Sequence, residues 1–126
     1  MTNLDWERMS AAAWQARKHA HLYGTTAVGA AAISQTGEVY AGCNAEHRFR
    51  SHDIHAEVNA IGSLISAGHQ KMTAIIVVAE RDRFTPCGAC LDWIFEFGGP
   101  DCLVAFQNRS EFFVRKASEL MPFYPG

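Results

Sequence analysis

The sequence predicts an α/β fold in which helices cover a mixed β-sheet, and three observations carry that prediction. Segments with strand character alternate along the chain with segments of helical periodicity. The run Ala-Ile-Ile-Val-Val-Ala at 74–79 is apolar throughout, which is typical of a central strand covered on both faces. Two further apolar runs, 28–34 and 39–43, flank a Gln-Thr-Gly turn at 35–37 and predict a hairpin.

The first half of the chain begins with a predicted helix over residues 5–21, which are rich in Ala, Gln, Arg and Lys. The hairpin follows, and the polar residues 44–53 predict a loop. A second helix is predicted from His55 onward, and Gly68 supplies its end. Apolar residues recur there at helical spacings, namely Ile54, Val58, Ile61 and Ile65.

In the second half, the strand at 74–79 leads to a helix that Pro86 opens and that runs on from Cys87 to the stop Gly-Gly-Pro at 98–100. The inward side of this helix is predicted to hold Leu91, Ile94 and Phe95. The remaining elements are a strand at 103–106, a further strand at 111–116 and a short helix at 117–121. No repeat or linker interrupts this order, so residues 1–126 are predicted to form one domain.

The composition and the charge of the chain argue against several classes of function. A net charge of −2 without a basic stripe argues against a dedicated nucleic-acid binder and favours a small polar substrate. No stretch approaches the roughly 20 apolar residues that a membrane span needs, so no membrane partner is expected. Residues 1–20 carry several charges and no apolar run, unlike a signal peptide, and a cytoplasmic location is the resulting expectation.

Two short motifs carry the chemistry. His-Ala-Glu at 55–57 offers an imidazole and a carboxylate, and Pro-Cys-Gly-Ala-Cys at 86–90 offers two thiols. On a helix the two cysteines share a face, and the helix N-terminus favours their thiolate form. In a reducing compartment this spacing indicates a metal site or a redox site. Cys43 and Cys102 lie in apolar stretches and are interpreted as small buried hydrophobes.

The candidate ligands His55, Cys87 and Cys90 favour a catalytic zinc over a closed structural one. Three protein ligands leave a fourth position for water, and two thiolates balance the charge of Zn²⁺. Glu57 is predicted to move protons rather than to bind the metal. His55 and Glu57 would diverge in mid-helix, so both must lie in an irregular first turn. A redox dithiol and a non-catalytic zinc-stabilised binding domain are the alternatives, and neither has a use for Glu57.

These motifs match the zinc-dependent deaminase signature, and the chain resembles the cytidine deaminase superfamily over nearly its whole length. The segments 28–31, 42–46, 86–90 and 119–122 look like the small nucleoside cytidine deaminases in particular. The resemblance implies a three-layer α/β/α sandwich and a zinc-dependent hydrolytic deaminase of cytidine- or deoxycytidine-type nucleosides. It also implies a homotetramer whose pockets are completed across subunits.

Several substrate-binding roles follow from this resemblance alone. Asn44 and Glu46 are implied to hydrogen-bond the sugar hydroxyls, because an amide and a carboxylate offer the donor and acceptors that a ribose needs. The Ala56 N–H is implied to hold the pyrimidine carbonyl. The Thr85 C=O is implied to receive the leaving amino group.

The chain also departs from the family pattern. His55 takes the place of a third cysteine that many short cytidine deaminases use. Thr26 stands where the family has an aromatic residue near the base, so the pocket is expected to be wider, and a tail aromatic of a neighbouring subunit, Phe123 or Tyr124, is expected to supply a ring. The wider pocket motivates an alternative substrate, namely an N4-substituted cytidine or an antibiotic nucleoside such as blasticidin S. A nucleic-acid base deaminase is a further alternative, which the low basic content disfavours.

Overall fold

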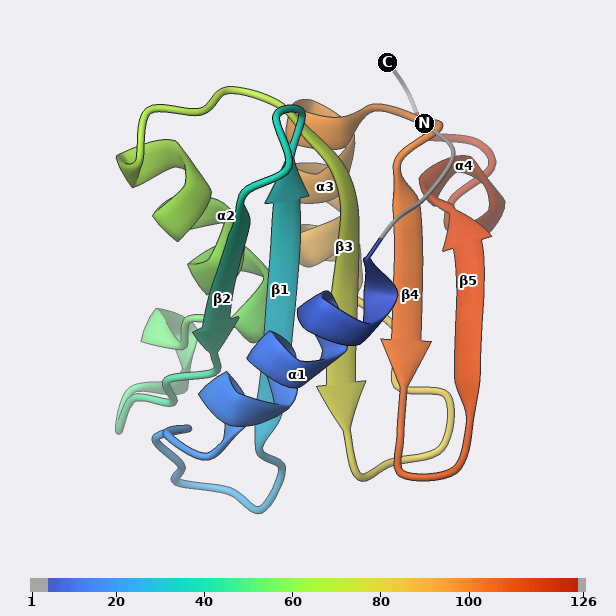
Figure 1. The fold of residues 1–126 in the computed structure, drawn as a ribbon. Helices are drawn as coiled ribbons and strands as arrows, with labels where there is room; N and C mark the ends of the chain where they lie inside the picture. Colours follow the sequence, from blue (N-terminus) through green and yellow to red (C-terminus); the bar gives the residue numbers. More distant parts are fainter. Residues whose placement is uncertain (1–4, 125–126) are drawn as a thin grey trace.

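The computed structural model describes residues 5–124, and a five-stranded sheet of order β2-β1-β3-β4-β5 forms its centre (Figure 1). The strands are β1 (Val28–Ser34), β2 (Val39–Cys43), β3 (Met72–Ala79), β4 (Leu103–Gln107) and β5 (Phe112–Lys116). β1 pairs antiparallel with both β2 and β3, β3 pairs parallel with β4, and β4 pairs antiparallel with β5. The predicted mixed sheet is therefore confirmed.

Helices lie on both faces of this sheet. α1 (Trp6–Arg17) crosses one face, while α2 (Ala56–Ser66) and α3 (Gly88–Gly98) lie side by side on the other (Figure 1). A 3₁₀ turn at Arg50–His52 precedes α2, and the short helix α4 (Ala117–Leu120) follows β5. The arrangement is the three-layer α/β/α sandwich that the resemblance implies. Among residues 5–124, no helix is both long and apolar enough to cross a membrane.

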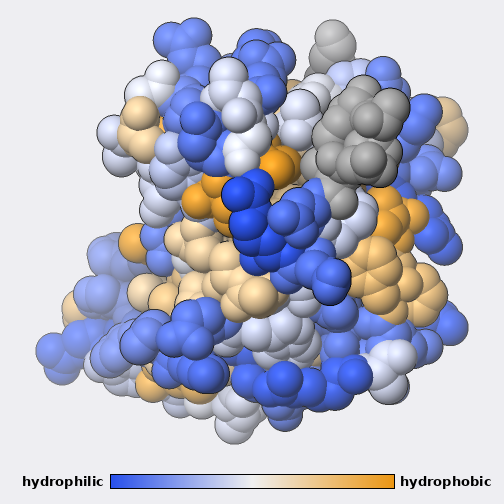
Figure 2. Space-filling view, in the orientation of Figure 1, coloured by the Kyte–Doolittle hydropathy of each residue, from blue (hydrophilic) through white to orange (hydrophobic). Residues whose placement is uncertain are grey.

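The central strand β3 shows why its sequence is apolar without alternation. Successive side chains of a strand point to opposite faces, and both faces of β3 are covered. Ile75 and Val77 pack in the core beneath α2 and α3, whereas Ile76 and Val78 pack in the core beneath α1. On the face that carries α1, hydrophilic residues dominate the exposed surface and apolar residues gather in patches beside the helix (Figure 2).

Two predicted details differ from the structure. The first helix ends at Arg17 rather than at residue 21, because His21 pairs by its backbone with the segment 44–46. The His21 N–H donates to the Asn44 carbonyl (3.1 Å), and the His21 carbonyl accepts from the Glu46 N–H (2.7 Å). The helix predicted from residue 55 is present as α2, but Ile54 and Ile65 are exposed, and its fully buried side chains are those of Ala60, Ile61 and Leu64.

Gly42 of β2 allows α2 to lie directly against the sheet, and Gly42→Ala is expected to destabilise the protein. An added Cβ would lie 2.6 Å from the Ala60 nitrogen and 2.8 Å from the Asn59 Cβ, so the helix would have to move. We expect a loss of about 1–3 kcal/mol in the free energy of unfolding, measured by urea denaturation. The matched control is Gly62→Ala, where an added Cβ meets no described atom within 4 Å, and which should not lower stability.

Candidate active site

The N-terminus of α2 presents His55 and Glu57 to one cavity. His55 is the N-cap residue, and its backbone is extended (φ −77°, ψ 154°) rather than helical. Its side chain therefore does not take the direction that it would have within the helix. Glu57 lies in the first helical turn and is only 3% exposed. The irregular first turn that the sequence required is therefore present.

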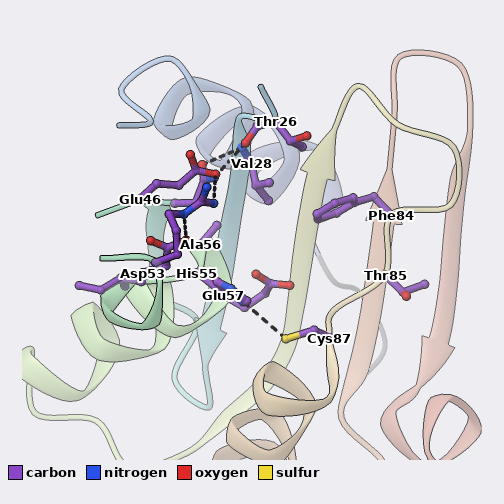
Figure 3. Close-up of a pocket in the computed structure, with 13 residues that line it drawn as sticks. Thr26, Val28, Glu46, Asp53, His55, Ala56, Glu57, Phe84, Thr85 and Cys87 are labelled. Carbon is purple, nitrogen blue, oxygen red and sulfur yellow. Dashed lines mark hydrogen bonds and ion pairs between the residues drawn. The ribbon is translucent and has the colours of Figure 1, made fainter. Parts of the chain in front are cut away.

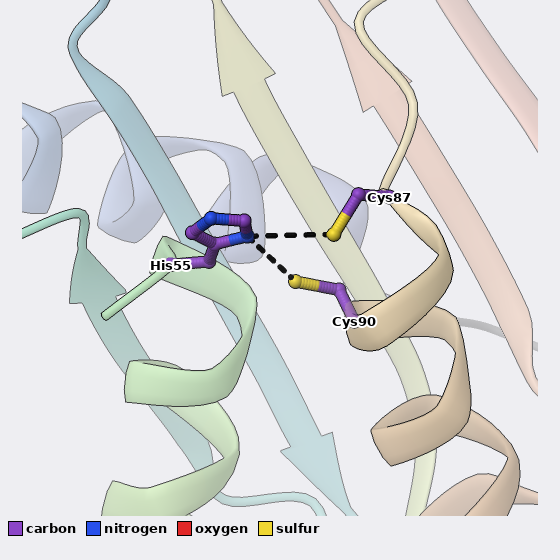
Figure 4. A group of neighbouring side chains, drawn as sticks. All are labelled: His55, Cys87 and Cys90. Carbon is purple, nitrogen blue, oxygen red and sulfur yellow. Dashed lines mark hydrogen bonds between the residues drawn. The ribbon is translucent and has the colours of Figure 1, made fainter. Parts of the chain in front are cut away.

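The N-terminus of α3 presents the two cysteines in the same way. Cys87 is the N-cap residue (φ −75°, ψ 175°), and Cys90 is buried in the first turn. α2 and α3 lie side by side, so the N-termini of both helices point at the same place (Figure 4). The partial positive charge of a helix N-terminus stabilises a thiolate.

The imidazole and both sulfurs converge, although His55 and Cys87 are 32 positions apart. Nδ1 of His55 lies 3.4 Å from Sγ of Cys87 and 3.3 Å from Sγ of Cys90 (Figure 4). All three ligand atoms lie within 4.8 Å of one another. Ligand bond lengths of tetrahedral zinc place a nitrogen and a sulfur about 3.6 Å apart, so the three atoms fit one zinc ion.

The electrostatics around Cys90 disfavour its thiolate form in the absence of a bound cation. Burial raises the pKa of the Cys90 thiol far above its ordinary value, and the nearby Glu57 and Cys87 raise it further. A thiolate at this position therefore needs a positive charge beside it. Burial likewise raises the pKa of the Glu57 carboxyl above its ordinary value of 4.5, so this group holds a proton more readily than an exposed glutamate does.

A cavity of about 290 Å³ opens in front of these residues (Figure 3). Its walls contain every predicted site residue except Cys90 and Phe123: Thr26, Asn44, Glu46, His55, Ala56, Glu57, Thr85 and Cys87. Ligand pockets of about 300–1,000 Å³ are usual, so this cavity suits a small molecule. Phe123 is 94% exposed and does not reach the cavity of its own chain, so its predicted contribution to a neighbouring subunit stays a prediction.

Asn44 and Glu46 are held firmly at the wall. Asn44 Oδ1 accepts from the Val28 N–H, and its Nδ2 donates to the Thr26 carbonyl, both at 2.9 Å. Glu46 Oε1 accepts from the N–H groups of Tyr23 and Gly24, each at 2.6 Å. These two N–H groups lower the pKa of the Glu46 carboxyl, which is therefore ionised at neutral pH.

The comparison with known proteins covers most of the chain. The family model for the cytidine and deoxycytidylate deaminase zinc-binding region matches residues 4–106. The chain belongs to this family. Zinc is accordingly the cofactor of this chain, and the His55–Cys87–Cys90 group of the deaminase fits that ion in geometry and in charge. The predicted superfamily, fold and cofactor are confirmed.

Individual relatives of this deaminase extend along nearly all of it. The cytidine deaminase of Mycobacterium tuberculosis is 32% identical over 124 residues, 97% of this chain and 90% of the relative. A blasticidin-S deaminase of Bacillus cereus is 32% identical over 104 residues, 75% of this chain and 74% of the relative. The crystal structure of cytidine deaminase from Burkholderia pseudomallei matches with a TM-score of 0.91 at 32% identity, covering 97% of this chain and 100% of that one.

Five lining residues of the deaminase were not among its predicted site residues: the apolar Val28 and Ile54, and the three residues Arg50, Asp53 and Phe84. Arg50 donates to Asp53 Oδ2 (2.9 Å) and pairs with Glu46 Oε2 (3.1 Å), so it joins both carboxylates at one wall. Glu46 precedes Arg50 by four positions, and Asp53 follows it by three. This spacing of opposite charges is a sequence signal from which the network could have been predicted. Phe84 is the third of these residues, and it belongs to no recognisable sequence motif.

Proposed function

We propose that this chain is a zinc-dependent hydrolytic deaminase that converts cytidine-type nucleosides to uridine-type products with release of ammonia. The observation that carries the proposal is the buried carboxyl of Glu57 beside a three-ligand metal group, at the wall of a cavity of about 290 Å³. A structural zinc site has four protein ligands and no need of such a carboxyl. A redox dithiol has no need of His55.

The proposed mechanism divides the work among the residues of this chain. When bound, zinc lowers the pKa of a water to about 7 and so supplies a nucleophile at neutral pH. Glu57 would take one proton from the attacking water and deliver it to N3 of the base as the hydroxyl adds to C4. It would then take the second proton from that hydroxyl and give it to the amino nitrogen, so that the C4–N bond breaks, ammonia leaves and the C4 carbonyl forms. The overall reaction consumes one water, and the oxygen of that water becomes the new carbonyl oxygen.

Backbone groups are proposed to orient the base. The N–H groups at the start of a helix have no partner within the helix, which leaves the Ala56 N–H of α2 free to donate to the pyrimidine carbonyl. The Thr85 carbonyl, which precedes Pro86 at the cavity wall, accepts from the amino group. Asn44 and Glu46 bind the sugar hydroxyls, because each retains hydrogen-bonding capacity beyond its bonds to the protein.

A modified cytosine nucleoside is the second candidate substrate. The Bacillus cereus relative is a blasticidin-S deaminase, and Thr26 leaves the cavity without the aromatic side chain expected at that position. Glu46 favours a cytidine-type nucleoside over blasticidin S, since its ionised carboxylate is placed for a ribose hydroxyl. The size of the cavity and the net charge of −2 disfavour a polymeric nucleic acid.

Ammonia release from a panel of cytosine compounds tests this order of candidates. We expect turnover of cytidine and deoxycytidine, weaker or no turnover of N4-acylcytidine and blasticidin S, and none of single-stranded DNA or RNA. Zinc content is measured on the same sample, so that inactivity is not confused with loss of the ion. Preferred turnover of blasticidin S would select the second candidate. Zinc-loaded protein that releases no ammonia from any compound would contradict both.

We further infer a homotetramer, for which the exposed apolar residues along the outer side of α2, including Ile54 and Ile65, offer a contact surface. A groove on this side is lined by Val58, Gly62 and Ala67 among others. Light scattering of the purified protein measures the oligomeric state directly. A role in pyrimidine salvage and a cytoplasmic location remain predictions that accompany this function.

A further inference from the structure

Phe84 provides the one benzene ring in the cavity wall formed by the described residues. It lies in the segment that joins β3 to α3, two residues after Asp82 and three before the candidate ligand Cys87. Figure 3 shows its ring extending from the β3 side of the cavity toward the wall formed by Val28 and Thr26. The ring is therefore part of the surface that a bound ligand would contact.

The backbone ahead of Phe84 adopts a conformation that is uncommon for a residue other than glycine. Arg83 has φ 48° and, among residues 5–124, is the one non-glycine residue with a positive φ. A left-handed conformation at such a residue costs roughly 1–2 kcal/mol, and residues of this kind cluster at functional sites. Arg83 lies in a turn directly before Phe84, and the ring of Phe84 lies in the cavity wall.

Two further contacts fix the segment in place. Arg81 Nη2 donates to the Thr26 hydroxyl (2.6 Å), and Asn108 Nδ2 donates to the Arg81 carbonyl (3.3 Å). The Phe84 ring itself is half-buried and packs against the core beneath α2 and α3. Thr26, which replaces the aromatic residue expected at its own position, therefore anchors a segment that carries another ring.

We propose that Phe84 is the base-stacking residue of this cavity, and that Arg83 and the Arg81–Thr26 hydrogen bond are its positioning elements. This inference rests on the proposed function, because it names the wall against which a pyrimidine ring lies. A planar base gains from a face-to-face aromatic contact, and such stacking is sequence-tolerant because every base has a π-face. The ring lies beside Thr85, whose carbonyl is proposed to meet the amino group of the same base.

Phe84→Leu removes the flat ring but keeps an apolar side chain. We expect the KM for cytidine to rise roughly 5- to 150-fold with kcat little changed, because base stacking is lost equally from ground and transition states. Phe84→Tyr, which keeps the ring, should restore most of the affinity. The matched control is Phe112→Leu on β5, where a half-exposed phenylalanine lies outside the cavity wall and the KM should stay at the wild-type value.

NMR spectroscopy of the product complex detects the stacking contact between Phe84 and the base without any reaction taking place. The H5 and H6 protons of uridine, the product, should shift upfield on binding to the wild-type protein through the ring current of Phe84, and Phe84→Leu should abolish that shift. Arg83→Val, which disfavours a positive φ, should also reduce the shift, and Arg83→Asn, which tolerates it, should reduce it less.

The results of these experiments distinguish a failure of the stacking role of Phe84 from a failure of the proposed deaminase function. Wild-type KM and an unchanged upfield shift in Phe84→Leu, with cytidine still deaminated, would overturn the stacking role and leave the proposed function standing. Wild-type protein that neither deaminates cytidine nor binds uridine would overturn both. Zinc content and Tm measured on every variant show whether a lost signal comes from unfolding.

Discussion

Glu57→Gln is expected to fold and to bind zinc as the wild type does, yet to lose about 10²- to 10⁴-fold in kcat for cytidine. The amide has the shape of the carboxyl and fits the same buried position, which is 3% exposed in the wild type. It neither accepts the proton of water nor returns it to the base. Steady-state ammonia release and zinc content by elemental analysis measure the two properties separately.

The matched control for this change is Glu96→Gln, which makes the same substitution on the exposed side of α3, outside the cavity wall. Its turnover should equal that of the wild type. Undiminished kcat in Glu57→Gln would refute the proposed mechanism. Loss of zinc from Glu57→Gln would instead identify the carboxylate as a ligand, against the three-ligand group proposed above.

Cys87→Ala is expected to abolish both stoichiometric zinc binding and turnover. Because Cys87 is exposed, its truncation leaves no cavity in the core, so a fall in stability reports the loss of the metal. A ligand present at 1,000 times its dissociation constant stabilises the folded state by about 4 kcal/mol. The corresponding fall in Tm for a domain of this size is roughly 10 to 25 °C.

Differential scanning calorimetry with and without added zinc measures this effect, and treatment of the wild type with a chelator should reproduce it. Cys43→Ala is the control, since Cys43 lies on β2 and outside the metal group. It should keep zinc, turnover and Tm close to the wild-type values. A Cys87→Ala protein that retains one zinc per chain and deaminates cytidine would show that the ion is held by other residues.

The elements of the fold were accessible from the sequence because their signals are local. The unbroken apolar run of β3 reflects its two covered faces, and the turn at 35–37 marks the hairpin. The end of α1 was not accessible, because the backbone of His21 pairs with a segment more than twenty residues further along the chain. Periodicity also predicted α2 without showing that Ile54 and Ile65 lie outside the core.

The residues of the candidate site likewise fall into those that the sequence predicted and those that it did not. The ligand motifs are recognisable because zinc dictates residue types and spacing, and the first-turn placement of Glu57 follows from helix geometry. Phe84 follows Arg83, whose left-handed backbone no local sequence pattern predicts, and this residue was accordingly not expected in the cavity wall. The spacing of Glu46, Arg50 and Asp53 marks their charge network, whereas its place at the cavity wall depends on where the polar loop folds back.

The place of β3 between the two ligand-bearing segments gives a bound ion a second effect. His55 precedes β3 and Cys87, 32 positions after His55, follows it, and the imidazole and the thiols meet at the N-termini of α2 and α3. An ion held by both segments would therefore cross-link the chain around the central strand. Such a clip restricts the unfolded chain by closing a loop, as a disulfide does.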